Sequence, residues 1–211
     1  MKIKTTCLLT FLLLTTLASY AQNFEGKIVY QNTLKSKIAG VSDQQFSEML
    51  GTKQEYMIKG GNYKSISNGT MMQWQLYINS DNKIYNKMST SPSILWMDAA
   101  ANPDTVVKAV INRNVTTILG YQCDELILTC KSGVQKYYFS SKLKVDARLF
   151  ENHKLGNWSE FMSRSKALPL KMIIDSPQMT LESVATSVTP MKLDDKEFQL
   201  PSGSKVEKSP Y

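Results

Sequence analysis

The side chains best suited to chemistry are one histidine, three cysteines and two pairs of adjacent carboxylates. His153, the only histidine, lies in the polar stretch 150–154. A Ser or Cys nucleophile needs such a base, oriented by a third group, and no second supporting group is near His153 in the sequence. A lone histidine in a polar loop is typical of a surface residue, so we predict that His153 lies on the surface and takes no part in catalysis.

The adjacent carboxylates do not form a hydrolytic pair. Asp124 precedes Glu125 and Asp194 precedes Asp195, and neighbours on a strand point to opposite faces, so neither pair can share a proton or flank a bond. The methionines are dispersed, which gives no soft-metal motif. We therefore predict no catalytic residue, no enzyme activity, no metal site and no cofactor.

Cys123 and Cys130 are the only candidates for a disulfide in the exported chain. The residues between them contain no Gly, Pro or Asn and are typical of a strand. On one continuous strand the two Cα atoms would lie about 23 Å apart, whereas a disulfide tolerates about 7 Å. The odd spacing also sends the side chains to opposite faces. Two packed free thiols are favoured over a bridge or a reactive or metal-binding thiol.

Apolar side chains give the only candidates for a ligand site. In the stretch 72–78, apolar and polar residues alternate, so one face of a strand is apolar. The stretch 93–97 is an apolar patch inside a predicted loop, and loops of this kind cover a core or guard a cavity mouth. The predicted lining of an apolar cavity is Trp74, Leu76, Trp96, Met97, Trp158 and Met162. Core packing is the alternative role for the methionines.

The N-terminus has the pattern of a cleaved secretory signal. Lys2 and Lys4 precede the apolar stretch 7–17, and small residues precede a cut after Ala21. The stretch is too short to span a bilayer, and no cysteine at the cut could carry a lipid. We predict a signal peptide over 1–21 and one domain over 22–211, periplasmic or secreted, with neither a membrane-spanning segment nor a lipid anchor.

The charge does not favour a nucleic-acid partner. Removing Lys2 and Lys4 from 25 basic residues leaves 23 against 18 acidic ones, a net charge of +5. Nucleic-acid recognition relies on arginine and clustered charge. Only Arg113, Arg148 and Arg164 are arginines, and the lysines are scattered.

The elements that position these residues are predicted to be strands and three short helices. A capping box at Ser42 and Gln45 predicts a helix over 43–50. Asn102 and Pro103 predict a helix start before an apolar stripe at 106–111, and an N-cap at Asn157 predicts a helix over 158–165. Strands are predicted at 24–31, 53–59, 63–67, 72–78, 83–88, 115–130, 134–144, 170–174 and 179–189, with a coil from 198. The predicted fold class is α+β, a strongly curved antiparallel sheet of eight or more strands with about three short helices.

Several short motifs carry a resemblance that spans nearly the whole mature chain. They are Phe24–Ile28, Ile58–Lys64, Ile118–Cys123, Leu168–Met172 and Asp194–Gly203. Their order resembles that of a group of uncharacterised exported proteins of Gram-negative bacteria, which is similar in turn to the LolA-type lipoprotein carriers. The resemblance implies a LolA-like half-barrel, an incomplete curved antiparallel barrel with helices on its concave side, and in the carriers an apolar cavity that shields acyl chains.

Two functions remain open at this stage. The first is a non-catalytic exported binding protein that holds a lipid-like or other apolar ligand, such as a lipid or a lipoprotein acyl chain, in the half-barrel. The second is a cell-envelope adaptor that contacts another envelope protein and whose barrel is filled by side chains. A cavity of about 300 Å³ or more would favour the first.

Overall fold

The computed structural model describes residues 23–210, and the predicted signal peptide 1–21 with its cleavage site after Ala21 lies outside the described residues. The described chain forms one twelve-stranded sheet with two α-helices and three 3₁₀-helices. The strands are β1 (Gly26–Ser36), β2 (Lys53–Lys59), β3 (Asn62–Ser67), β4 (Met72–Ile78), β5 (Lys83–Met88), β6 (Ile94–Asp98), β7 (Val106–Ile118), β8 (Tyr121–Cys130), β9 (Gly133–Lys144), β10 (Ala167–Asp175), β11 (Met179–Pro190) and β12 (Val206–Lys208). The helices are α1 (Asp43–Leu50), α2 (Trp158–Ser165), η1 (Ala147–Phe150), η2 (Leu155–Asn157) and η3 (Asp195–Phe198).

The predicted α+β class with three short helices is wrong, because the described chain is dominated by a single mixed sheet and has two α-helices. The helix predicted after Asn102 is absent from this part of the chain, and its apolar stripe forms the start of β7. The stripe consists of β-branched residues, which fit a pleated strand better than a helix. Pairing with β8 over most of the length of β7 outweighs the helix-start signal.

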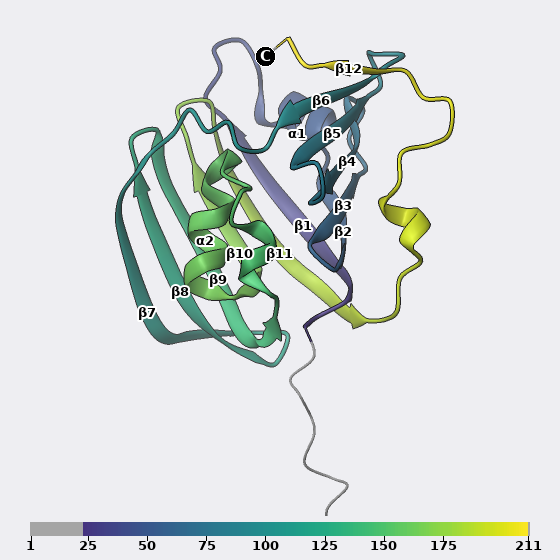
Figure 1. The fold of residues 1–211 in the computed structure, drawn as a ribbon. Coiled ribbons are helices and arrows are strands. Elements are labelled where there is room, and N and C mark those ends of the chain that lie inside the picture. Colours follow the sequence, from purple (N-terminus) through teal and green to yellow (C-terminus); the bar gives the residue numbers. More distant parts are fainter. Residues whose placement is uncertain (1–22, 211) are drawn as a thin grey trace, which may run out of the picture.

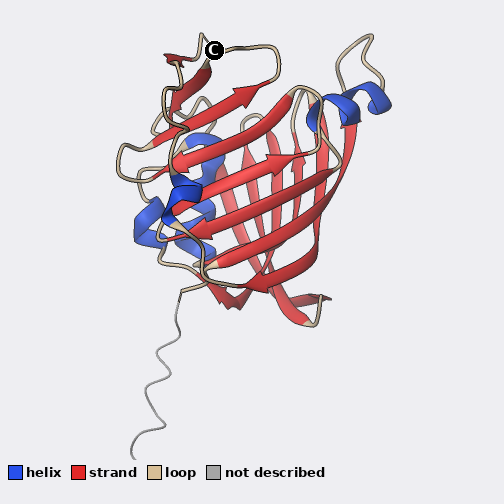
Figure 2. Ribbon diagram, turned by 90° about the vertical axis from the view of Figure 1, so that its right-hand side faces the viewer, coloured by secondary structure: helices blue, strands red, loops and turns tan. Residues whose placement is uncertain are grey.

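The sheet is built from two groups of strands joined at its centre. The strand order is β12-β6-β5-β4-β3-β2-β1-β11-β10-β9-β8-β7, and all neighbours are antiparallel except β12 and β6, which are parallel. The central pair, β1 with β11, joins the first and last parts of the chain. Figure 1 shows β2 to β6 on one side of this pair and β7 to β10 on the other, and Figure 2 shows the strong curvature that the sequence predicts.

Most predicted strands of the first group are confirmed, since β2, β4 and β5 have the predicted bounds and β3 begins one residue earlier. The capping box is present as well: Ser42 Oγ accepts from the backbone N–H of Gln45, and the Gln45 side chain accepts from the N–H of Ser42. The apolar patch 93–97 was predicted as a loop, and this is wrong because most of it is strand β6, paired with β5 and β12.

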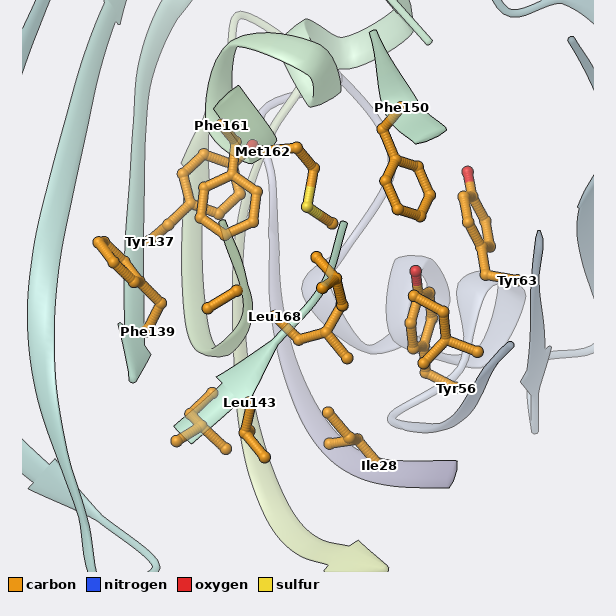
Figure 3. Close-up of a cluster of buried hydrophobic side chains, with 14 of the residues drawn as sticks. Ile28, Tyr56, Tyr63, Tyr137, Phe139, Leu143, Phe150, Phe161, Met162 and Leu168 are labelled. Carbon is orange, nitrogen blue, oxygen red and sulfur yellow. The ribbon is translucent and has the colours of Figure 1, made fainter. Parts of the chain in front are cut away.

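Apolar side chains cover both faces of the first group of strands. The main core covers the concave face of both groups of strands. In the second group, α2 packs over this face at β8, β9 and β10 (Figure 1). Phe161 and Met162 of α2 are fully buried there, next to Tyr137 (Figure 3). A second, smaller cluster lies on the opposite face of β4, β5 and β6. It contains Leu76, Tyr85, Ile94, Leu193 and Phe198, the last two supplied by the C-terminal segment.

Strand β8 departs from the simple alternation that the sequence predicts. Cys123 and Cys130 are both free, and both lie in the main core with Leu126 and Leu128. The prediction that Cys123 and Cys130 point to opposite faces is wrong. The alternation of β8 is interrupted between Cys123 and Leu126, opposite the point where the pairing of β7 with β8 shifts between Asn112 and Thr116.

No helix in the part of the chain that the structure describes is long and apolar enough to span a membrane.

Candidate functional site

The concave face of the sheet holds a cavity of about 330 Å³ beneath η2 and the start of α2. Five aromatic side chains from five elements line it: Tyr30, Tyr56, Tyr63, Tyr137 and Trp158. The curvature of the sheet brings them together, because β1, β2 and β3 supply the first three while β9 and α2 supply the others. The resulting wall suits contact with apolar or aromatic groups.

The tyrosines of neighbouring strands stack on one another. The ring of Tyr63 lies 5.2 Å from that of Tyr56 and 5.2 Å from that of Tyr77, at interplanar angles of 28° and 26°. Tyr63 and Tyr77 are direct cross-strand partners of β3 and β4, and such aromatic pairs stabilise a sheet. This stack fixes the wall of the cavity before any ligand enters.

His153 lies in the wall of this cavity and is 3% exposed, so the prediction of a surface residue is wrong. Its Nε2 lies 2.8 Å from the hydroxyl of Tyr63, and its ring lies 4.4 Å from that of Tyr77. Burial lowers the pKa of His153 to about 4, because removing the imidazolium from water costs free energy. His153 is therefore neutral at pH 7.

The other titratable groups of the cavity wall are also uncharged. Burial raises the pKa of Tyr30, Tyr56, Tyr63 and Tyr137 above the ordinary value of a phenol. No Asp, Glu, Lys or Arg is among the described residues that line the cavity. At neutral pH the wall thus carries hydrogen-bonding groups but no charge.

Three polar atoms of the wall are buried and have no hydrogen-bond partner within residues 23–210. They are Tyr56 Oη, His153 Nδ1 and Trp158 Nε1. Each unsatisfied group costs on the order of 1–3 kcal/mol of folding free energy. The cavity wall is thus a place where stability is given up, which is more typical of a functional site than of a plain core.

A row of uncharged polar side chains crosses the concave face beside the aromatic wall. Six consecutive strands, β11, β1, β2, β3, β4 and β5, supply one residue each. In that order the polar row consists of Ser183, Asn32, Gln54, Ser65, Gln75 and Asn86. Adjacent members bond in pairs, with distances of 2.7 Å from Ser183 Oγ to Asn32 Oδ1, 2.6 Å from Gln54 Nε2 to Ser65 Oγ and 3.0 Å from Gln75 Nε2 to Asn86 Oδ1.

The polar row separates the cavity from a second hollow of about 170 Å³. Gln54, Ser65 and Gln75 line both spaces, while Leu34, Leu181 and other residues line only the second one. No charged side chain is among the described residues around the second hollow either. The concave face therefore offers an aromatic compartment, a polar row and a smaller compartment in sequence.

The structure separates the six residues that the sequence proposes for ligand binding. Of these, Trp158 lines the cavity. Met162 is buried in the main core and Met97 packs against that core. Trp74, Leu76 and Trp96 belong to the second cluster on the opposite face. A ligand-binding role for these residues stays a prediction, while the cavity itself is built mostly from other residues.

Sequence reasoning missed the tyrosines, the glutamines and His153. In the stretch 72–78 it assigned the apolar face of Trp74 and Leu76 to the cavity, whereas Gln75 and Tyr77 occupy the concave face. One signal was available, since Tyr56 and Tyr63 lie on either side of the turn at Gly60 and Gly61 and are diagonal neighbours on one face of the hairpin, where Tyr56 pairs with Ser65 and Ile58 with Tyr63. The face of this hairpin that carries a tyrosine on each strand was therefore a candidate for the inside of the half-barrel.

No group of three or more His, Cys, Asp or Glu side chains in residues 23–210 is arranged to hold a metal ion. The two thiols of this region are buried, and burial raises the pKa of Cys130 to about 11, which disfavours the nucleophilic thiolate. What the site can do chemically is to stack on a ligand, exclude water from it and form neutral hydrogen bonds.

Comparisons with known proteins identify no family for this chain. No protein-family model matches it, and no curated protein is similar to it at a meaningful level. Among solved structures, that of PNGF-II has a TM-score of 0.48 and 14% identity, covering 88% of this chain and 32% of that one. The crystal structure of LprF from Mycobacterium bovis has a TM-score of 0.32 and 11% identity, covering 80% of this chain and 89% of that one. The chain thus spans about a third of PNGF-II, and at these TM-scores neither structure bears on its function.

Proposed function

We propose that this protein is a non-catalytic binding protein that holds a small apolar ligand in the aromatic cavity. The observation that carries the proposal is the cavity itself: about 330 Å³ of space, lined by five aromatic side chains and by no charged one among the described residues. This volume exceeds the usual lower limit of about 300 Å³ for small-molecule sites. An adaptor with a filled barrel would leave no such space, so the binding function is favoured over it.

The resemblance of the sequence to exported LolA-like proteins supports the same proposal. On that resemblance the domain is a LolA-like half-barrel over 22–211, exported to the periplasm or secreted, and its ligand is lipid-like. The strongly curved sheet (Figure 2) with α2 over its concave face (Figure 1) agrees with such a half-barrel. The absence of enzyme activity is part of the proposal.

The test is binding of Nile red, an uncharged apolar dye whose fluorescence rises in apolar surroundings. We expect saturable binding to the protein. The variant Leu155→Trp adds bulk at a residue that lines the cavity and should weaken dye binding by roughly tenfold or more, because an overfilled site cannot pack a guest. The matched control is Ile38→Trp, at a position that is 42% exposed, and it should bind the dye like the unchanged protein.

Native mass spectrometry of the protein purified from its own host provides a second measurement. A bound molecule of a few hundred daltons, lost in the Leu155→Trp variant, is the expected result. If Nile red does not bind, and the protein carries no small molecule, the proposed function is wrong.

A further inference from the structure

We infer that the ligand is an uncharged amphiphile whose hydrogen-bonding group lies on the polar row at Gln54, Ser65 and Gln75, with its apolar part in the aromatic compartment. This inference rests on the proposed function and adds the chemical class of the ligand. It follows from three features of the concave face: the position of the polar row, its unused hydrogen-bonding capacity and the lack of charge around it.

The position of the polar row places hydrogen-bonding groups at one end of the cavity. Gln54, Ser65 and Gln75 line both the aromatic compartment and the second hollow, and Ser65 is a direct cross-strand partner of Gln75. Tyr56 and Tyr63 follow Gln54 and precede Ser65 on the same faces of β2 and β3. A molecule that fills the aromatic compartment therefore meets the polar row where that compartment ends.

The hydrogen bonds within the polar row leave most of its capacity free. A primary amide offers two donor hydrogens and an acceptor oxygen, and a hydroxyl offers one donor and acceptor lone pairs. In the Gln54–Ser65 and Gln75–Asn86 bonds each glutamine uses a single N–H. Neither of these two bonds uses the acceptor oxygens Gln54 Oε1 and Gln75 Oε1. The row can thus both donate to and accept from a hydroxyl, an amide or an ester.

The lack of charge selects against ionised ligands. None of the described residues around either space is Asp, Glu, Lys or Arg, and His153 is bonded through Nε2 to Tyr63. An ionised group on the polar row would be removed from water without a counter-ion, which is costly. A hydroxyl or amide pays a far smaller desolvation cost and recovers it through the glutamines.

The size of the space sets the length of a suitable probe. A cavity of about 330 Å³ that is partly open to solvent holds at least roughly eleven groups the size of a water molecule, at about 30 Å³ each. An eight-carbon chain with a small head group has a comparable number of non-hydrogen atoms. Four such probes differ in the head group alone: 1-octanol, octanamide, octanoate and octyltrimethylammonium.

The experiment is isothermal titration calorimetry of these four probes at pH 7.5, where octanoate is ionised. We expect 1-octanol and octanamide to bind at least roughly tenfold more tightly than both ions, because of the unpaired charge. The variant Gln75→Leu should weaken octanamide binding by at least roughly fivefold, and by more than it weakens Nile red binding. The control Gln178→Leu, an exposed residue of the turn between β10 and β11, should change neither.

The outcomes separate this inference from the proposed function. If Nile red binds but octanoate or octyltrimethylammonium binds as tightly as octanamide, the inference is wrong and the proposed function stands. The same holds if Gln75→Leu, shown by circular dichroism to be folded, binds octanamide like the unchanged protein. If neither Nile red nor any probe binds, the proposed function fails as well.

Discussion

The buried state of His153 predicts a specific loss of stability in mild acid. In the folded protein its pKa is about 4, against the ordinary value of 6.5. The unfolded chain therefore takes up a proton at a pH at which the folded protein does not. As a result, the free energy of unfolding falls as the pH drops from 6.5 toward 4. At 1.36 kcal/mol per pKa unit, the full effect is about 3 kcal/mol.

The window from pH 7 to pH 5 isolates most of this effect. Over this range the loss from His153 is about 2 kcal/mol, calculated from the two pKa values. Carboxylates titrate mainly below pH 5, and no other histidine is present in the sequence. Urea unfolding followed by tryptophan fluorescence at pH 7, 6 and 5 measures the free energy of unfolding at each pH.

The control variant is His153→Gln, which keeps every carboxylate and removes the imidazole. The comparison uses the pH dependence of each protein and not its absolute stability, because the variant also alters the contact with Tyr63. We expect the loss of about 2 kcal/mol between pH 7 and pH 5 to disappear in the variant. Parallel pH curves for the two proteins would refute the assignment of the effect to a buried, neutral His153.

Two further predictions concern the backbone and the thiols. Gly133 has φ of +148° and its added Cβ would meet the backbone oxygen of Asp175, whereas Gly120 has φ of +78° with open space around it. Urea unfolding should therefore show that Gly133→Ala is less stable than Gly120→Ala by roughly 2 kcal/mol, and equal stabilities would contradict the close approach. Burial raises the pKa of Cys123, and that of Cys130 to about 11, so peptide mapping should find both labelled by Ellman's reagent at pH 8 only after unfolding. Labelling of either cysteine in the native protein at the rate of an exposed thiol would show that it is accessible.

The fold could be predicted from the sequence where turns and alternation act locally. The turn residues between β2 and β5 and the capping box at Ser42 depend on neighbours in the chain, and these elements have nearly the predicted bounds. The N-cap signal at Asn157 predicted helix α2 with its observed bounds, whereas the signal at Asn102 failed for a non-local reason. The Asn102 side chain instead donates from Nδ2 to Asn157 Oδ1 at 2.8 Å, and the residues from Val106 onward pair with β8.

The site could not be predicted because it depends on which face of each strand is concave. Alternation along β4 distinguishes the face of Leu76 from that of Gln75, but both faces are covered: one by the C-terminal segment with Phe198 and the other by the main core. Period-two patterns do not specify the direction of curvature. The burial of His153 likewise depends on Tyr63, which is 90 residues away in the sequence.

The pairing of β1 with β11 has a consequence for how the protein is made. Asn32 and Ser183, which pair across this junction, are 151 residues apart in the sequence. At synthesis rates of about 5–20 residues per second, β1 waits roughly 8 to 30 s for its partner strand to emerge. The hairpins on either side can form from local contacts in that time, whereas closing the long loop comes late. Because Tyr56 comes from one side of this junction and Tyr137 and Trp158 from the other, the cavity exists only once the junction has closed.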